Sequence, residues 1–301
     1  MARAYDVLVV SNYFLDLVFT GLPAMPELGQ EVFGTGFEMA PGGGFNSAAA
    51  MRRLGLRVAW VGDFGNDDFS RLALERARAE DIDVSLSAQH PRPLRRITVA
   101  ASFPGDRAFI SFADPEPATP AALKALTRAS AEAVYVGGLV SGSAFDAGLL
   151  LARARRMRVV MDGNGADHAS LADRGVRRAL SGVDVFMPNL REAQKLTGRH
   201  DVMDALQALA QVCRLVVIKA GADGAYATTR GSECVHAPAI PVTPVDTTGA
   251  GDCFSAGFMK AWLAGRPLEE CLKWGNAVGG LSTTAAGASR VVTSDDVAPY
   301  L

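Results

Sequence analysis

Short apolar runs alternate with helical patterns over the first 220 residues, and this alternation limits the possible folds more than any other feature. The apolar runs predict strands at 5–10, 57–62, 132–137, 158–161, 184–187 and 215–218, with helices at about 45–54, 67–79, 121–129, 144–155, 189–196 and 202–211. Strands separated by helices are typical of βαβ units, so we predict a mostly parallel sheet with helices on both faces. Ligands bind such sheets at the carboxyl ends of the strands.

Two segments depart from this pattern. Residues 14–40 and 95–113 are predicted to form paired antiparallel strands, the second pair turning at Pro104-Gly105-Asp106. We interpret them as a lid over an active site, with a plain edge hairpin as the alternative. Helices are expected again at 251–264 and 268–285. A length of 301 residues suits one large α/β domain spanning 1–301.

Composition disfavours several classes of protein. The net charge is −2 with no basic stripe, so no nucleic-acid partner is expected. The sequence contains no run of about 18 apolar residues, so we expect no membrane span. The first residues do not resemble a signal peptide. The four cysteines show no C-x-x-C spacing, which favours free thiols in a cytoplasmic protein.

The stretch Asp246 to Phe258 is the most informative for chemistry. Small residues at 249–251 lead into a predicted helix, whose free N–H groups and positive dipole end favour a phosphate. Asp252 in the first turn would then be placed to accept a proton from an attacking hydroxyl. Gly-Ala-Gly-Asp alone is more typical of an ordinary capped helix, but Asp-Thr-Thr before it and a small-residue helix after it make the pattern more specific.

Four motifs resemble those of the ribokinase/PfkB family of carbohydrate kinases, and they follow one another in the same order as in that family. In chain order they are Gly42-Gly43-Gly44-Phe45-Asn46-Ser47-Ala48, Asn189-Leu190-Arg191-Glu192, Lys219-Ala220-Gly221-Ala222-Asp223-Gly224 and the stretch from Asp246 to Phe258. The resemblance implies a ribokinase-like three-layer α/β/α sandwich with a mostly parallel central sheet and a small β-strand lid. It also implies ATP-dependent phosphorylation of a sugar-like hydroxyl.

The resemblance assigns roles residue by residue. The anion hole would consist of Gly249, Ala250 and Gly251, and the catalytic base would be Asp252. The substrate would be bound by Asp16, Gly42, Gly43 and Asn46.

The resemblance also implies a nucleotide site and two cation sites. The nucleotide would be bound by Asn189, Glu192, Lys219, Gly221, Gly224 and Asn276, and Glu192 would hold Mg²⁺ through water. A monovalent cation such as K⁺ would be bound by Asp246 and Thr248, with carbonyls near 282–291.

Ordinary structural explanations stay open for some of these residues. Asn189 and Glu192 are also typical of a helix capping box, and Lys219 to Gly224 of a simple turn. Asn276 is equally a candidate for a hydrogen-bonded helix residue, and Asp16 for a surface charge.

The acceptor is left open by the sequence. Phe14 and Phe45 replace residues usual in ribokinase, which puts ribose itself in doubt, and a free sugar or polyol is favoured. A nucleoside is the alternative, with Phe14, Phe45 and Phe103 as stacking surfaces. Arg95 and Arg96 are interpreted as a solvated basic pair, or else as a site for a sugar phosphate.

Other functional classes are less favoured. A non-catalytic sensor on the same fold conflicts with the intact Asp252, and a dehydrogenase conflicts with the incomplete glycine fingerprint at Gly42-x-Gly44-x-x-Ser47. A homodimer through the lid strands is expected by analogy with the family.

Overall fold

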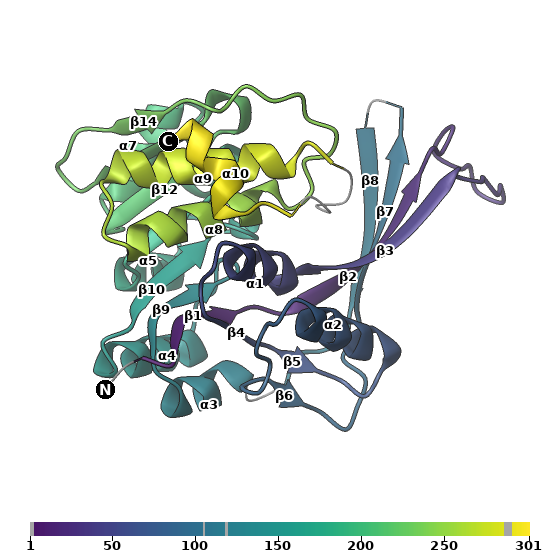
Figure 1. The fold of residues 1–301 in the computed structure, drawn as a ribbon, viewed down its shortest axis with the longest axis horizontal. Helices are drawn as coiled ribbons and strands as arrows, with labels where there is room; N and C mark the ends of the chain where they lie inside the picture. The colour runs from purple at the N-terminus through teal and green to yellow at the C-terminus, as the bar shows by residue number, and fades with distance from the viewer. Residues whose placement is uncertain (1–2, 105, 118–119, 286–290) are drawn as a thin grey trace.

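The computed structural model describes residues 3–104, 106–117, 120–285 and 291–301 (Figure 1). Within these residues the larger sheet has eight strands in the order β14-β13-β12-β11-β10-β9-β1-β4. Their bounds are β1 (Tyr5–Val10), β4 (Val58–Val61), β9 (Ala131–Val136), β10 (Arg158–Asp162), β11 (Val185–Met187), β12 (Leu215–Lys219), β13 (Ala225–Thr229) and β14 (Val235–Ala237). The six strands from β4 to β12 pair in parallel, and β13 and β14 add antiparallel neighbours at one edge.

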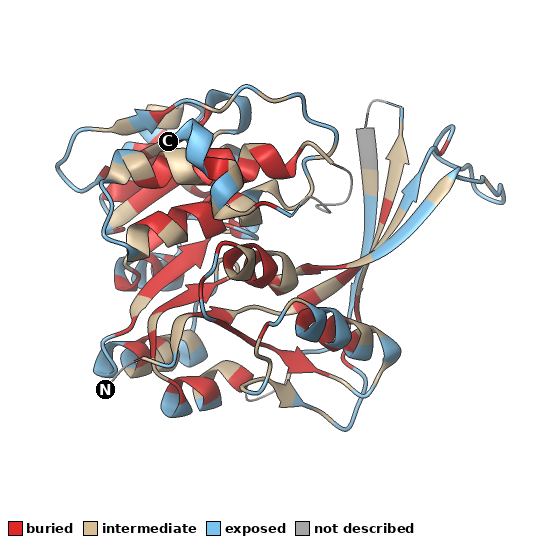
Figure 2. Ribbon diagram, in the orientation of Figure 1, coloured by how far each residue is buried: buried red, intermediate tan, exposed pale blue. Residues whose placement is uncertain are grey.

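The two faces of this sheet pack into two separate hydrophobic cores, because successive side chains of a strand point to opposite faces. In β9, for example, Ala133 and Tyr135 join one core, whereas Val134 and Val136 join the other. The buried strands stand out in red at the centre of Figure 2. The sheet is therefore the middle of three layers, and the predicted fold class is confirmed.

Helices from different parts of the chain cover each face. The Tyr135 face carries α1 (Gly44–Arg53), α2 (Asp68–Ala79), α8 (Ala250–Leu263), α9 (Leu268–Ser282) and the short α10 (Ser294–Val297). The Val134 face carries α3 (Ala121–Arg128), α4 (Ser143–Ala154), α5 (Arg174–Gly182), α6 (Leu190–Thr197) and α7 (Val202–Ala210). Among the described residues no helix is both long and apolar enough to cross a membrane.

A second, four-stranded sheet projects from this body, at the right of Figure 1. Its order is β3-β2-β7-β8, with β2 (Tyr13–Thr20), β3 (Gly36–Gly43), β7 (Arg96–Phe103) and β8 (Asp106–Ala113). β2 pairs antiparallel with β3 but parallel with β7, so the two expected hairpins join through a parallel contact that the sequence did not indicate. A further short pair joins β5 (Asp63–Phe64) to β6 (Ala88–Gln89).

The second sheet has two chemically different faces. Residues opposite one another in neighbouring strands share a face. One row across the sheet therefore consists of Ala40, Asp16, Thr98 and Ser111, and the next row of Met39, Leu17, Val99 and Ile110. One face is polar around Asp16, and the opposite face is apolar.

Candidate active site

The first turn of α8 presents the glycine-rich segment. Gly249 caps the helix with φ of 73°, in the left-handed region that favours glycine, so the chain can turn sharply into the helix. The Ala250 amide donates to the Thr247 carbonyl at 3.2 Å, whereas Gly251 is exposed at the helix start. The positive end of the helix dipole favours a negative charge at this point.

Asp252 lies in that first turn, partly buried, and contacts the first turns of α1. The Ser47 hydroxyl donates to its Oδ1 at 2.5 Å. Burial raises the pKa of Asp252 to about 6, the charge of Asp162 adds to the rise, and hydrogen bonds from Ser47 and Asn46 and the charge of Lys219 oppose it. A carboxylate with this pKa is mostly ionised at neutral pH, yet it accepts a proton more readily than an exposed aspartate.

Asp162, which sequence reasoning missed, organises a buried network behind Asp252. Its Oδ2 accepts hydrogen bonds from the hydroxyl of Tyr135 at 2.9 Å and of Ser255 at 3.0 Å, and from the Lys219 ammonium at 2.8 Å. Asp162 ends an apolar strand at the carboxyl edge of the sheet, and this position was the available signal.

Lys219 ends β12 and reaches toward the start of α8. A β-carbon placed on Gly251 would lie 3.6 Å from the Lys219 ammonium. The salt bridge with Asp162 thus holds a cation beside the helix end where an anion is favoured. The structure therefore brings Lys219 together with Gly251 and Asp252.

Asn189 and Glu192 form the capping box that the sequence allowed. The Asn189 side chain accepts from the Glu192 amide at 2.8 Å, and the Glu192 carboxylate accepts from the Asn189 amide at 2.7 Å. The main chain also links them to β12, because the Lys219 amide donates to the Pro188 carbonyl at 2.9 Å. Burial raises the pKa of Glu192 despite the Asn189 amide and the Lys219 charge.

These carboxylates do not form a complete metal site by themselves. Within the described parts of the chain, no three His, Cys, Asp or Glu side chains gather closely enough to hold a metal ion. Mg²⁺ usually keeps several waters and takes one or two carboxylates plus phosphate oxygens, so Glu192 fits a site completed by water and nucleotide.

Gly224 and Asn276 both contact the end of β14, whereas Gly221 lies in the turn before β13. Gly224 has φ of 83°, and a β-carbon there would lie 2.1 Å from the Ala237 carbonyl, so close packing requires this glycine. The Asn276 side-chain amide donates to the carbonyls of Ala237 at 2.8 Å and Pro238 at 2.9 Å. Asn276 therefore fixes the chain after β14, whereas Gly221 has φ of 59° in an open turn.

Asp246 and Thr248 lie together in the loop before α8. Asp246 Oδ1 accepts from the Thr248 amide at 2.9 Å and from its hydroxyl at 2.7 Å. The amides of Val245 and Asp246 both donate to the Thr283 carbonyl, which attaches this loop to the end of α9. Residues 286–290 of the expected 282–291 stretch lie outside the described residues.

Asp16 lies on β2 beside the glycines that end β3. A β-carbon on Gly42 would lie 2.5 Å from the Asp16 carboxylate, and one on Gly43, whose φ is 60°, would lie 2.8 Å from the Asn12 carbonyl. Burial alone raises the pKa of Asp16 to about 6, so Asp16 is not the plain surface charge that the sequence also allowed. Asn46, on the following helix, faces Asp252 instead.

Comparison with known proteins agrees with this geometry. Residues 23–295 match the pfkB family carbohydrate kinase. A ribokinase from Bacillus subtilis is 28% identical over 287 residues, covering 94% of each chain. A cytidine kinase from Thermococcus kodakarensis is 38% identical over 132 residues, covering 42% of this chain and 47% of that protein.

The chain belongs to the pfkB family of carbohydrate kinases. It is therefore a phosphotransferase that acts on a hydroxyl group of a sugar or nucleoside. A solved structure of Arabidopsis thaliana ribokinase, complexed with ribose and ATP, shares the fold of this kinase with a TM-score of 0.84 at 22% identity, covering 99% of this chain and 98% of that chain.

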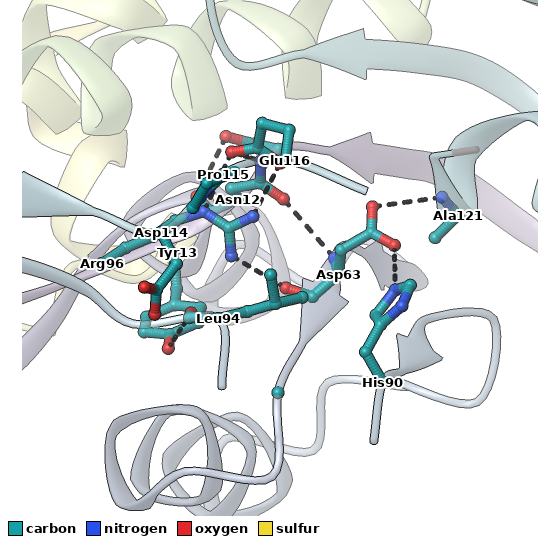
Figure 3. Close-up of polar contacts among 12 residues, drawn as sticks. Asn12, Tyr13, Asp63, His90, Leu94, Arg96, Asp114, Pro115, Glu116 and Ala121 are labelled. Carbon is teal, nitrogen blue, oxygen red and sulfur yellow. Dashed lines mark hydrogen bonds and ion pairs between the residues drawn. The ribbon is translucent and has the colours of Figure 1, made fainter. Parts of the chain in front are cut away.

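The interpretation of Arg95 and Arg96 as a solvated pair is wrong for Arg96, whereas Arg95 is exposed as expected. The Arg96 side chain is only 1% exposed and donates to both carboxylate oxygens of Glu116, at 3.2 and 2.8 Å, and to the Asp63 carbonyl at 2.9 Å (Figure 3). Arg95 is bonded through two nitrogens to Asp114. Each arginine already has a carboxylate partner, which the local sequence pattern could not reveal.

Two of the three phenylalanines expected as stacking surfaces are placed otherwise. Phe45 packs against Trp60 in the core, with ring centroids 6.2 Å apart. Strand alternation puts Phe103 on the same face as Val99, the apolar face of the second sheet. Only Phe14 of these three shares the Asp16 face of the kinase.

Proposed function

We propose that this kinase transfers the γ-phosphoryl group of ATP to a hydroxyl of a free sugar or related polyol. The observation that carries the proposal is Asp252 in the first turn of α8, hydrogen-bonded by Ser47 and with a pKa of about 6. As the hydroxyl oxygen bonds to the γ-phosphorus, its proton passes to Asp252 and the bond to the ADP oxygen breaks. Gly249, Ala250 and Gly251 surround the transferred group at the positive end of α8.

The acceptor is held by Asp16, Gly42, Gly43 and Asn46. A carboxylate accepts two hydrogen bonds, which suits the neighbouring hydroxyls of a sugar. The polar row of the second sheet, with Thr98 and Ser111 hydroxyls 3.1 Å apart, adds further polar groups beside Asp16.

Charge disfavours a sugar phosphate as acceptor. Arg95 and Arg96 are paired with Asp114 and Glu116, and the acceptor side presents the Asp16 carboxylate. A nucleoside is the alternative, supported by the similarity to a cytidine kinase and by Phe14 on the Asp16 face.

The nucleotide lies across the ends of β11 and β12. Asn189, Glu192, Lys219, Gly221, Gly224 and Asn276 line its site. Lys219 is positioned for the phosphates by Asp162. Mg²⁺, bound by Glu192 through water, supplies positive charge to the phosphates, and Asp246 and Thr248 belong to a K⁺ site beside the anion hole.

Residues 1–301 act as one kinase domain, with the second sheet as its lid. Closure of the lid excludes water from the transfer. The apolar lid face includes Phe37, 60% exposed, and Ile110, 67% exposed, and we place a homodimer contact there. Four free cysteines favour a reducing cytoplasm.

ATP consumption with Mg²⁺, measured across free sugars, polyols, nucleosides and sugar phosphates, tests this proposal. We expect turnover with one free sugar or polyol, which stops in Asp252→Asn. Repeating the assay in potassium-only, sodium-only and tris-only buffers tests the K⁺ site, and equal rates would exclude it. Turnover of sugar phosphates alone would refute the assigned acceptor, and ATP binding without any turnover would favour a sensor.

A further inference from the structure

A deep apolar cavity lies on the face of the larger sheet opposite to α8. Its volume is about 450 Å³, and its walls include Leu126 of α3, Leu149 of α4, and Val134 and Val159 of the sheet. Asp252 and the Asp162 network lie on the Tyr135 face instead. The apolar body of the cavity therefore lies on the opposite face of the sheet from Asp252, although Ser11 and Asn12 line its mouth, and its volume is typical of small-molecule sites.

Small residues keep this space open. Ala144, Gly148 and Ala152 follow one another at intervals of four along α4, so they share the face that lines the cavity. A β-carbon on Gly148 would lie 3.4 Å from a Leu126 methyl group, in ordinary contact, so a larger side chain there would enter the space.

The core is also divided at this point. Val61, Ala121 and Ala125 form a small hydrophobic cluster of their own, apart from the larger cluster on the same face of the sheet. The cavity has walls from both clusters, and Val10, which lines it, packs against both, so an apolar occupant would extend the contact between these two parts of the core. Water in such a space finds few hydrogen-bond partners, which favours its replacement by an apolar group.

The mouth of the cavity is polar, and its two carboxylates are hydrogen-bonded. Ser11, Asn12, Asp63 and Glu116 line it. Glu116 accepts hydrogen bonds from the buried Arg96 and from the Asn12 amide, at 3.3 and 3.2 Å (Figure 3). Asp63 accepts from the Ala121 amide at 3.1 Å and lies 2.7 Å from His90 Nε2. Both carboxylates therefore already have polar partners, and the mouth can still offer hydrogen bonds to a neutral polar group.

We propose that this cavity binds a small neutral amphiphile, with its apolar body between α3, α4 and the sheet and a hydroxyl at Ser11, Asn12 and Glu116. The site adjoins the acceptor side through the main chain, because the Asn12 carbonyl accepts from the Gly44 amide at 2.9 Å. Binding does not depend on the proposed phosphoryl transfer, and its test needs neither ATP nor turnover.

The test compares three probes that share one aromatic ring: 2-phenylethanol, phenylacetate and phenethylamine, which are neutral, anionic and cationic. Binding to the full chain is measured by ligand-detected NMR and titration calorimetry. Gly148→Leu fills the cavity, and Ala144→Leu fills its outer part if the first variant does not fold. Ala154→Leu places the same side chain on the exposed side of α4 and is the matched control.

We expect 2-phenylethanol to bind more tightly than either charged probe, and its affinity to fall about tenfold or more in the filled variants but not in Ala154→Leu. ATP should not displace it, since the active site lies on the other face. Absence of binding, equal binding to the filled variants, or displacement by ATP would overturn the proposal.

Discussion

Replacement of Asp252 by Asn should inactivate the kinase and at the same time stabilise its fold. Burial raises the pKa of this carboxyl from its ordinary value of 3.8 to about 6. The ionised form is therefore less stable in the folded protein than in the unfolded chain, and the difference corresponds to about 3 kcal/mol at neutral pH. An amide of the same shape still accepts from Ser47 but carries no charge.

The pH dependence of this effect follows from the same pKa. Below pH of about 4 the carboxyl is protonated in both states, so wild type and Asp252→Asn should have equal stability. As the pH rises toward 6 the folded carboxyl keeps its proton longer than the unfolded one, and the wild type loses stability relative to the variant. Above 6 the difference should stay constant.

Thermal unfolding at pH 4, 5, 6 and 7.5 measures this difference. A protein of this size gives an increase in Tm of up to about 5 °C for 3 kcal/mol, and turnover should fall about 100-fold or more. Ser47→Ala, which removes the hydrogen bond but keeps the charge, should lower stability instead. A variant that is less stable than wild type at pH 7.5, or a difference that does not change with pH, would refute the reasoning.

Three further predictions concern the same molecule. Because Asp252 and Asp16 both have a pKa of about 6, kcat/KM should fall at least about tenfold from pH 7 to pH 5, as both lose the ionised form, and a flat pH–rate profile would contradict the assignment. Asp162→Asn removes a negative charge beside Asp252, so the acidic limb of that profile should move to lower pH, and an unchanged limb would show that Asp162 does not affect the base. Phe37→Glu places a charge on the apolar lid face and should halve the mass measured by light scattering, whereas Glu38→Gln on the opposite face should leave the mass unchanged.

The sheet and most helices could be predicted because their signals are local. Runs such as Leu215–Lys219 are apolar and short, and the helices between such runs repeat their apolar residues with helical spacing. Helix α5, Arg174–Gly182, is amphipathic but was not predicted; it is short and contains two glycines, which have low helix propensity. The antiparallel strands β13 and β14 were also missed: β13, Ala225–Thr229, consists of small and polar residues apart from Tyr226, and β14 has only three residues.

The polar network could not be predicted in this way. Asp162 contacts Ser255, which is 93 residues away in the chain, and nothing in the local sequence marks the pair. The burial of Arg96 could not be predicted either. A charged residue on a strand is usually exposed, but Arg96 is buried and hydrogen-bonded to Glu116 and Asp63.

The electrostatics of the site explain why this fold can bind ATP without a P-loop. Asp162, Glu192 and Asp252 place three carboxylates around one ammonium, that of Lys219, so the side chains alone would repel a nucleotide. The attraction must come from the start of α8, whose dipole and amides need no charged side chain, and from cations that arrive with the phosphates. In the proposed mechanism the carboxylates have separate uses: Asp162 orients Lys219, Glu192 caps α6 and would lie beside the cation, and Asp252 would receive the proton. Negatively charged side chains at a phosphate site are therefore compatible with the proposed catalysis, because the main chain at the start of α8 attracts the phosphate and the Asp252 side chain accepts the proton.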